Sequence, residues 1–170
     1  RFAQLLPMMN PGQKNRVRDL VLALPAETKL GRVYITKDGT AYVDFSRELA
    51  DKLRDLFEHT RDITPTDIRL LTIGRHFRLG PGLKAVVGRD NNENRRIMAL
   101  EQPGYRLFMP HGFPGPVALL AGEPAPEDAL AAGRLILKYS KPTPGMPRLI
   151  RFGSEVFDPG EPTPGDTGNL

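Results

Sequence analysis

The chain has 170 residues, of which 39% are hydrophobic and 26% are charged, and it contains no Cys and no Trp. This composition is typical of a globular protein with a hydrophobic core, and the missing cysteines exclude disulfides, thiolate metal sites and a cysteine nucleophile. The formal net charge of +4 is too small to indicate a partner by itself. No apolar run approaches the roughly 18 residues of a membrane span, so no membrane partner is expected. Because the chain begins at Arg1, we expect a fragment or a processed product.

The N-terminal segment is predicted to contain two helices and a hairpin. Apolar residues recur at helical spacing over residues 12–25, before a terminating proline. Residues 31–45 predict a β-hairpin, because Asp38-Gly39 is a turn signal between β-branched and aromatic residues. A second helix is expected from the N-cap Ser46. Its apolar stripe comprises Leu49, Leu53, Leu56 and Phe57.

The middle of the chain predicts a linker followed by two strands and a helix. Residues 60–67 are polar and contain Pro65, which favours a loop. Strands are expected at 68–77 and 83–88, joined by a tight turn at Gly80-Pro81-Gly82. A helix then extends to Leu100, with Asp90 or Asn91 as its N-cap.

The C-terminal half continues with short strands and one longer helix. Strands are predicted at 105–109, 117–120 and 148–152, and a helix at 127–139 with Leu130 among its buried positions. From Asp158 onward the chain has little to bury, so we expect a disordered tail.

These elements predict an α+β fold, in which helices pack on a short mixed or antiparallel sheet. Helices and strands alternate without clean βαβ units, which argues against a parallel sheet. The predicted domain organisation is a small N-terminal segment, a linker, a main domain and a disordered tail, at 1–60, 61–67, 68–157 and 158–170 respectively.

Positive charge is concentrated in one stretch. Residues 68–100 contain 7 Lys+Arg against 2 acidic residues, a local excess of +5. Basic residues interleaved with aromatics on strands suit phosphate contacts and base stacking. Gly88, just before a helix, would also let backbone N–H groups approach a phosphate. The alternative is a solvated basic face with structural turn glycines.

The sequence offers little support for catalysis, a metal site or a cofactor. His76 and His111 could act as an acid/base or ligand pair, but no Cys and no close carboxylate accompany them. A hydrogen-bonding or RNA-contacting histidine is the preferred interpretation, and a stand-alone enzyme that uses both histidines is the weaker alternative. We therefore predict no catalytic residues, no metal and no cofactor.

Four motifs, in order along residues 68–157, resemble the NFACT-type RNA-binding domain, in the bacterial variant that forms the C-terminal part of thiouridine-synthetase-like tRNA modification proteins. They are Gly-Arg-His-Phe-Arg-Leu at 74–79, Val-Gly-Arg-Asp-Asn-Asn-Glu-Asn at 87–94, Phe-Pro-Gly-Pro at 113–116, and Ala131-Ala132 leading to Tyr-Ser-Lys at 139–141. In the family an aromatic residue and a histidine usually adjoin before the Pro-Gly loop, whereas here Phe108 and His111 are separated.

The resemblance implies a non-catalytic α+β module of the cytoplasm that binds tRNA or another structured RNA and presents it to an ATP-dependent thiolation or modification enzyme. The 170 residues contain no Ser-Gly-Gly-x-Asp-Ser loop, so an ATP pyrophosphatase-type partner domain would supply the chemistry. The resemblance implies six RNA contacts and the basic stretch adds three more. The predicted set is Arg75, His76, Arg78, Lys84, Arg89, Asn94, Arg95, His111 and Lys141.

A second resemblance leads to a different function. Residues 17–50 are similar to part of a GerMN domain, mostly over the predicted hairpin and the start of the following helix. This resemblance implies an interaction module of envelope or spore proteins with no use for nucleic acid. The two hypotheses differ in what should precede Arg1: a pyrophosphatase loop for the first, an export signal for the second.

Overall fold

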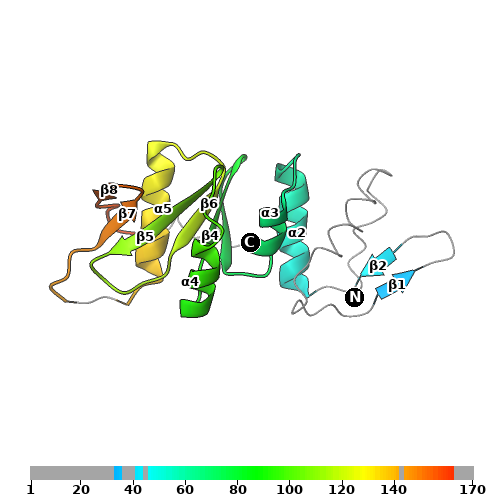
Figure 1. The fold of residues 1–170 in the computed structure, drawn as a ribbon, viewed down its shortest axis with the longest axis horizontal. Coiled ribbons are helices and arrows are strands. Elements are labelled where there is room, and N and C mark those ends of the chain that lie inside the picture. The colour runs from blue at the N-terminus through cyan, green and yellow to red at the C-terminus, as the bar shows by residue number, and fades with distance from the viewer. Residues whose placement is uncertain (1–32, 36–40, 44–45, 142–143, 163–170) are drawn as a thin grey trace. The chain divides into compact units, whose positions relative to one another are not determined.

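The computed structural model describes residues 33–35, 41–43, 46–141 and 144–162 (Figure 1). Contacts divide the chain into two compact units, Arg1–Thr72 and Ile73–Leu170. The helix expected at 12–25 lies outside the described residues. The domain boundaries expected from the sequence stay a prediction.

In the first unit, the predicted hairpin and the helix after it are confirmed. Strand β1 (Val33–Ile35) pairs antiparallel with β2 (Ala41–Val43), although the turn between them is outside the described residues. Helix α2 (Arg47–His59) begins at Ser46, whose Oγ accepts a hydrogen bond from the Leu49 N–H at 3.3 Å. The predicted apolar stripe of α2 is the buried side of the helix.

The expectation of a strand from residue 68 is wrong, because helix α3 (Pro65–Leu70) occupies the start of that segment. Pro65 is the first helical residue, where a missing N–H costs nothing. Thr64 and Asp67 form a capping box, in which the Asp67 carboxylate accepts from the Thr64 N–H at 2.8 Å and Thr64 Oγ1 accepts from the Asp67 N–H at 3.2 Å. Ile68 and Leu71 then pack against the apolar stripe of α2.

The second unit is built on a six-stranded, entirely antiparallel sheet, which confirms the α+β prediction. The spatial order of the strands is β3-β4-β6-β5-β7-β8. Their bounds are β3 (Arg75–Gly80), β4 (Leu83–Val87), β5 (Tyr105–His111), β6 (Ala118–Ala121), β7 (Leu149–Phe152) and β8 (Glu155–Phe157). Helix α4 (Asn91–Met98) follows β4 and contacts β6.

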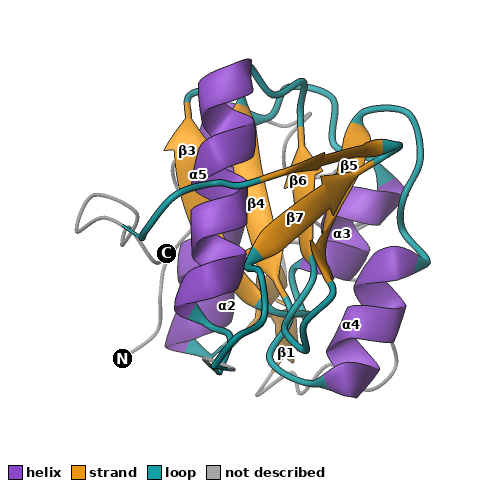
Figure 2. Cartoon of the chain, turned by 90° about the vertical axis from the view of Figure 1, so that its left-hand side faces the viewer, coloured by secondary structure: helices purple, strands orange, loops and turns teal. Residues whose placement is uncertain are grey.

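Helix α5 (Pro126–Lys138) lies across one face of this sheet (Figure 2) and contacts β4, β5 and β6. Side chains of alternate strand residues meet it there, as the two-residue period of a strand requires. The fully buried members of this core include Phe77, Phe108, Leu120, Leu135 and Ile150. Leu130, expected to be buried, is 38% exposed, whereas Leu135 and Ile136 are buried as the helical spacing predicts, together with Ala132.

The first residues of the predicted tail pack back on the sheet unit. β8, which the sequence analysis did not anticipate, pairs with β7, and the buried Pro159 lies against Gly133 of α5. Arg148 also reaches Glu161 at 3.3 Å. Residues 163–170 lie outside the described part of the chain.

Candidate nucleic-acid interface

Strand pairing brings distant segments of the sequence to one end of the sheet. Arg75 at the start of β3 pairs with Val87 at the end of β4, and Val87 in turn pairs with Ala118 at the start of β6. Ala118 pairs with Phe108 of β5, which ends at His111. The beginning of α4 and the loop 112–117 therefore lie at this same end.

Asn94 of α4 joins that loop to the helix. Its Oδ1 accepts a hydrogen bond from the Val117 N–H at 3.1 Å, and its Nδ2 donates to the Gly115 carbonyl at 3.5 Å. A Cβ on Gly88 would collide with Asn94 Oδ1, so the glycine leaves the room that the amide fills. Both ends of the Asn94 amide are thus engaged inside the protein, and Asn94 positions the loop.

The start of α4 is not an open anion site, contrary to the sequence-based expectation. The Gly88 N–H donates to the Val117 carbonyl at 3.1 Å, and the Arg89 N–H donates to Glu93 Oε2 at 2.8 Å. Asp90 Oδ1 accepts from the next two exposed amides, those of Asn92 and Glu93, at 2.8 and 2.9 Å. Carboxylates of the chain itself therefore occupy the helix terminus, where a phosphate would otherwise bind.

The end of α5 contacts the other side of the loop. A Cβ on Gly115 would collide with Ser140 Oγ, and it would stand 3.3 Å from the ring of Phe113. Lys141, which is exposed, follows directly after Ser140. The loop 112–117 is consequently held between α4 and the residues that end α5.

Tyr139, the C-terminal cap of α5, connects this region to β3. The Arg75 guanidinium carbon lies 4.6 Å from the centroid of the Tyr139 ring, and Lys138 Nζ lies 5.7 Å from it. Gly74, directly before β3, permits the chain to pass close to the end of β4, since it has φ +69° and a Cβ there would lie 2.7 Å from the Val87 carbonyl oxygen.

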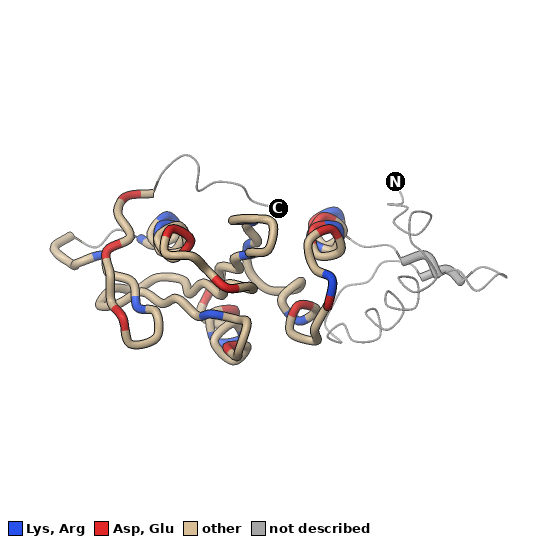
Figure 3. Tube along the Cα trace, turned by 90° about the horizontal axis from the view of Figure 1, so that it is seen from above, with Lys and Arg blue, Asp and Glu red and all other residues tan. Residues whose placement is uncertain are grey.

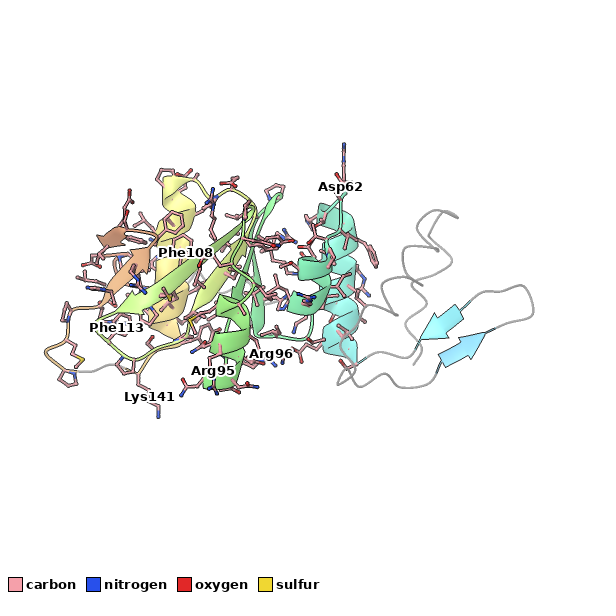
Figure 4. The ribbon with its side chains drawn as sticks, viewed as in Figure 1. Asp62, Arg95, Arg96, Phe108, Phe113 and Lys141 are labelled. Carbon is pink, nitrogen blue, oxygen red and sulfur yellow. The ribbon has the colours of Figure 1, made fainter. Side chains whose placement is uncertain are left out.

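Four cations at this end have no carboxylate partner in the described part of the chain: Arg75, Arg95, Lys138 and Lys141. We call them the basic end. Arg95 and Lys141 project from the same edge as the Phe113 loop in Figure 4. By contrast, Arg89 pairs with Glu93 at 3.8 Å, and Arg106, at the opposite end of the sheet, pairs with Glu123 at 3.2 Å. Acidic and basic positions elsewhere are interspersed (Figure 3).

Residues 74–153 match the family model described as NFACT protein RNA binding domain. This segment is an NFACT-type RNA-binding domain, and the match implies RNA binding. The matched range begins at Gly74 and includes all four residues of the basic end. No curated protein and no solved structure matches the chain. The comparisons detect no catalytic domain and give no support to the GerMN resemblance or to a thiouridine-synthetase context.

The NFACT-type domain does not bring all nine predicted residues to one surface. Arg75, Arg89, Asn94, Arg95, His111 and Lys141 lie at or beside the basic end. His76 and Lys84 are 1% and 7% exposed, because strands β3 and β4 are covered there on both faces, and His76 Nε2 donates to the Ile73 carbonyl at 2.9 Å. Arg78 is half-buried and lies toward the far end of β3, opposite Lys84 in the antiparallel pairing of β3 with β4. These three positions do not belong to the surface described above.

The separated aromatic and histidine of β5 lie in different environments. Phe108 is fully buried and stacks on Phe152 with ring centroids 4.4 Å apart, whereas His111 is exposed. Three residues apart on one strand, they face opposite sides of the sheet. Among the described residues, no group of three His, Asp or Glu side chains could hold a metal ion. No described helix is long and apolar enough to cross a membrane.

Lys138 of the basic end and the Tyr139 ring beside it were not predicted from the sequence as parts of a binding site. A lysine in the last turn of a helix ordinarily complements the helix dipole, so its sequence position carries no binding signal. Tyr139 is half-buried, and its contact with Arg75 joins residues that are far apart in the sequence.

Proposed function

We propose that the NFACT-type domain binds RNA through the basic end. The observation that carries this proposal is the gathering of four cations, from β3, α4, α5 and the residues just after α5, at the end of the sheet that holds the loop fixed by Asn94. Within the described residues none of the four has a carboxylate partner. Phosphate contacts supply most of the affinity of RNA-binding proteins, and cations already neutralised by the chain contribute less. Arg95 and Lys141 are exposed and available for such contacts.

The finer proposal is that the RNA is a structured one, tRNA in the first place, which the domain presents to an ATP-dependent modification enzyme on another domain or chain. The sequence resemblance supports this part of the proposal. It leaves the chain itself without turnover, with Arg75, Arg95, His111, Lys138 and Lys141 as the proposed contacts and Asn94 as a positioning residue.

The experiment measures binding of fluorescently labelled tRNA to the 170-residue chain over a range of salt concentrations. The double variant Arg95→Glu with Lys141→Glu should lower affinity on the order of tenfold at low salt, and it should flatten the dependence of log affinity on log salt by about 1.5. The matched control is Arg69→Glu with Arg151→Glu, two exposed arginines outside the basic end with the same total charge change.

Equal weakening by both double variants would show that only net charge matters and would reject the basic end as the site. Absence of tRNA binding by the parent chain at low salt would reject the function. An unstructured oligonucleotide of uridines that binds as tightly as tRNA would reject the preference for structured RNA.

A further inference from the structure

We infer that Arg75, Tyr139 and Lys138 form a preorganised subsite for one phosphodiester of the RNA, with Tyr139 as the residue that orients Arg75. The inference rests on the proposed function. It specifies that Arg75 is oriented for phosphate binding before RNA binds, whereas other cations of the basic end attract phosphate through their charge alone.

Arg75 lies against the ring of Tyr139. Its guanidinium carbon stands 4.6 Å from the Tyr139 centroid, within the range of a cation–π contact. Contact with a ring limits the orientations that the guanidinium group can adopt. A planar fork in a fixed orientation is suited to two parallel hydrogen bonds to a phosphate, and little side-chain entropy is left to lose on binding.

Tyr139 is itself held in place by the core and by the end of α5. Its ring centroid lies 5.8 Å from that of Phe77, which is 1% exposed and belongs to the core under α5. The backbone N–H of Tyr139 donates to the Leu135 carbonyl at 3.3 Å. The ring therefore stands on the core of the domain, and a rigid support is what a precise binding constellation requires.

Two positive charges lie beside the ring of Tyr139. Lys138 Nζ lies 5.7 Å from the same Tyr139 centroid, so two cations approach one aromatic side chain. No carboxylate of the described residues pairs with either cation. Two like charges at one ring repel each other, and a bound phosphate would relieve that repulsion. The dipole of α5 explains a cation at its C-terminus, but it does not explain Arg75, which belongs to β3.

The test compares conservative and disruptive variants of the full chain, with labelled tRNA as the probe and a salt titration for each. Tyr139→Phe keeps the ring and should bind like the parent. Tyr139→Leu removes the ring but no charge, so affinity should fall about threefold to tenfold while the salt slope stays unchanged. Arg75→Ala should lower the affinity and also reduce the slope by roughly 0.7 to 0.9, one phosphate contact.

Arg75→Lys keeps the charge and loses the fork, so it should weaken binding at an unchanged slope and should make a further Tyr139→Leu substitution nearly neutral. The single variant Arg75→Lys keeps Tyr139, so it remains informative if thermal unfolding shows that Tyr139→Leu fails to fold. Parent-like affinity of Arg75→Lys, or a Tyr139→Leu variant that loses stability and no affinity, would overturn the subsite.

The controls separate this inference from the proposed function. If Arg95→Glu with Lys141→Glu weakens tRNA binding while the Arg75 and Tyr139 variants bind like the parent, the function stands and the subsite is wrong. A DNA hairpin of the same length is the second probe. Equal effects of Arg75→Ala on both probes support recognition of a phosphodiester, whereas an effect confined to tRNA would contradict it.

Discussion

The side-chain oxygen of Asn94 accepts a hydrogen bond from the backbone N–H of Val117 at 3.1 Å, and this contact joins α4 to the loop that precedes β6. Asn94→Ala removes that acceptor and the weaker bond from Nδ2 to the Gly115 carbonyl at 3.5 Å. The free energy of unfolding should fall by about 1 to 3 kcal/mol, because a partly buried amide is left without its partner. Urea denaturation measures the change.

Asn94→Asp is the control for this prediction. It keeps an oxygen for the Val117 N–H, lies in the first half of α4 where negative charge is tolerated, and loses only the donor. It should therefore cost less than Asn94→Ala. Equal stability of the parent and Asn94→Ala would contradict the role assigned to Asn94.

Gly88 provides a test of the same contact from the opposite side. A Cβ at position 88 would collide with Asn94 Oδ1, so Gly88→Ala must displace the amide or the backbone. We expect a cost of about 1 to 3 kcal/mol in unfolding free energy. The cost should shrink in the Asn94→Ala background, because the colliding group is gone. Additive effects of the two substitutions in the double-mutant cycle would be evidence against the collision.

The elements that the sequence predicted best carry strong local signals. Ser46 before an apolar stripe, Asp90 before α4 and the Gly80-Pro81-Gly82 turn all act through neighbouring residues, and each lies where it was expected. The segment at Pro65 also carried a local signal, the Thr64 and Asp67 capping box, but the apolar residues that follow are equally typical of a strand.

The candidate site could be predicted only in part, because charge compensation is a property of three-dimensional neighbours. Arg89 and Arg95 look alike in the sequence, yet Glu93 pairs with the first and not with the second. In the sequence Lys84 resembles the other basic residues of this stretch, but it is buried because β4 is covered on both faces. The Arg75 contact with Tyr139 joins residues 64 positions apart and has no local signature.

The Glu93 carboxylate should compete with RNA phosphates for the Arg89 side chain. It pairs with Arg89 at 3.8 Å and accepts the Arg89 N–H at 2.8 Å. Glu93→Gln keeps an oxygen for that N–H and removes the negative charge that pairs with the Arg89 guanidinium. Affinity for tRNA should rise about twofold to fivefold at low salt, and the gain should fade at high salt because exposed charges are screened.

The measurement is a pair of tRNA titrations, one at low and one at high ionic strength. Glu155→Gln on β8 removes the same charge from an exposed site away from the basic end and serves as the control. An equal gain in both variants would mean that net charge, rather than Arg89, is responsible.

The capping box at the start of α3 should contribute measurably to the stability of the first unit. Asp67→Ala removes the acceptor of the Thr64 N–H and of Thr64 Oγ1, both at 2.8 Å. We expect a loss of about 1 kcal/mol in the free energy of unfolding. Thr64→Ser retains the hydroxyl and should remain close to the parent in the same denaturation experiment. A Thr64→Ser variant as unstable as Asp67→Ala would point to packing of the threonine methyl group instead.

The last prediction concerns the contact between Gly133 of α5 and Pro159, which lies beyond the residues that match the family model. A helix interior normally favours Ala over Gly by about 1 kcal/mol. In α5, however, a Cβ at position 133 would stand 2.5 Å from Pro159 Cβ, 3.0 Å from its Cγ and 3.2 Å from Ile150 Cγ1. Gly133→Ala should therefore destabilise the chain in spite of the helix preference, by about 1 to 3 kcal/mol.

Pro159→Gly removes the two nearest of these atoms, so Gly133→Ala should cost at least about 1 kcal/mol less in that background. Thermal and urea unfolding of the parent, both single variants and the double variant complete the cycle. Gly153→Ala, in the β7–β8 turn at φ +56° with no atom near a Cβ, separates backbone strain from collision, since its cost should be the same with or without Pro159. If Gly133→Ala stabilises the parent chain, residues 158–162 do not pack on α5 in solution, and the folded domain ends before Pro159.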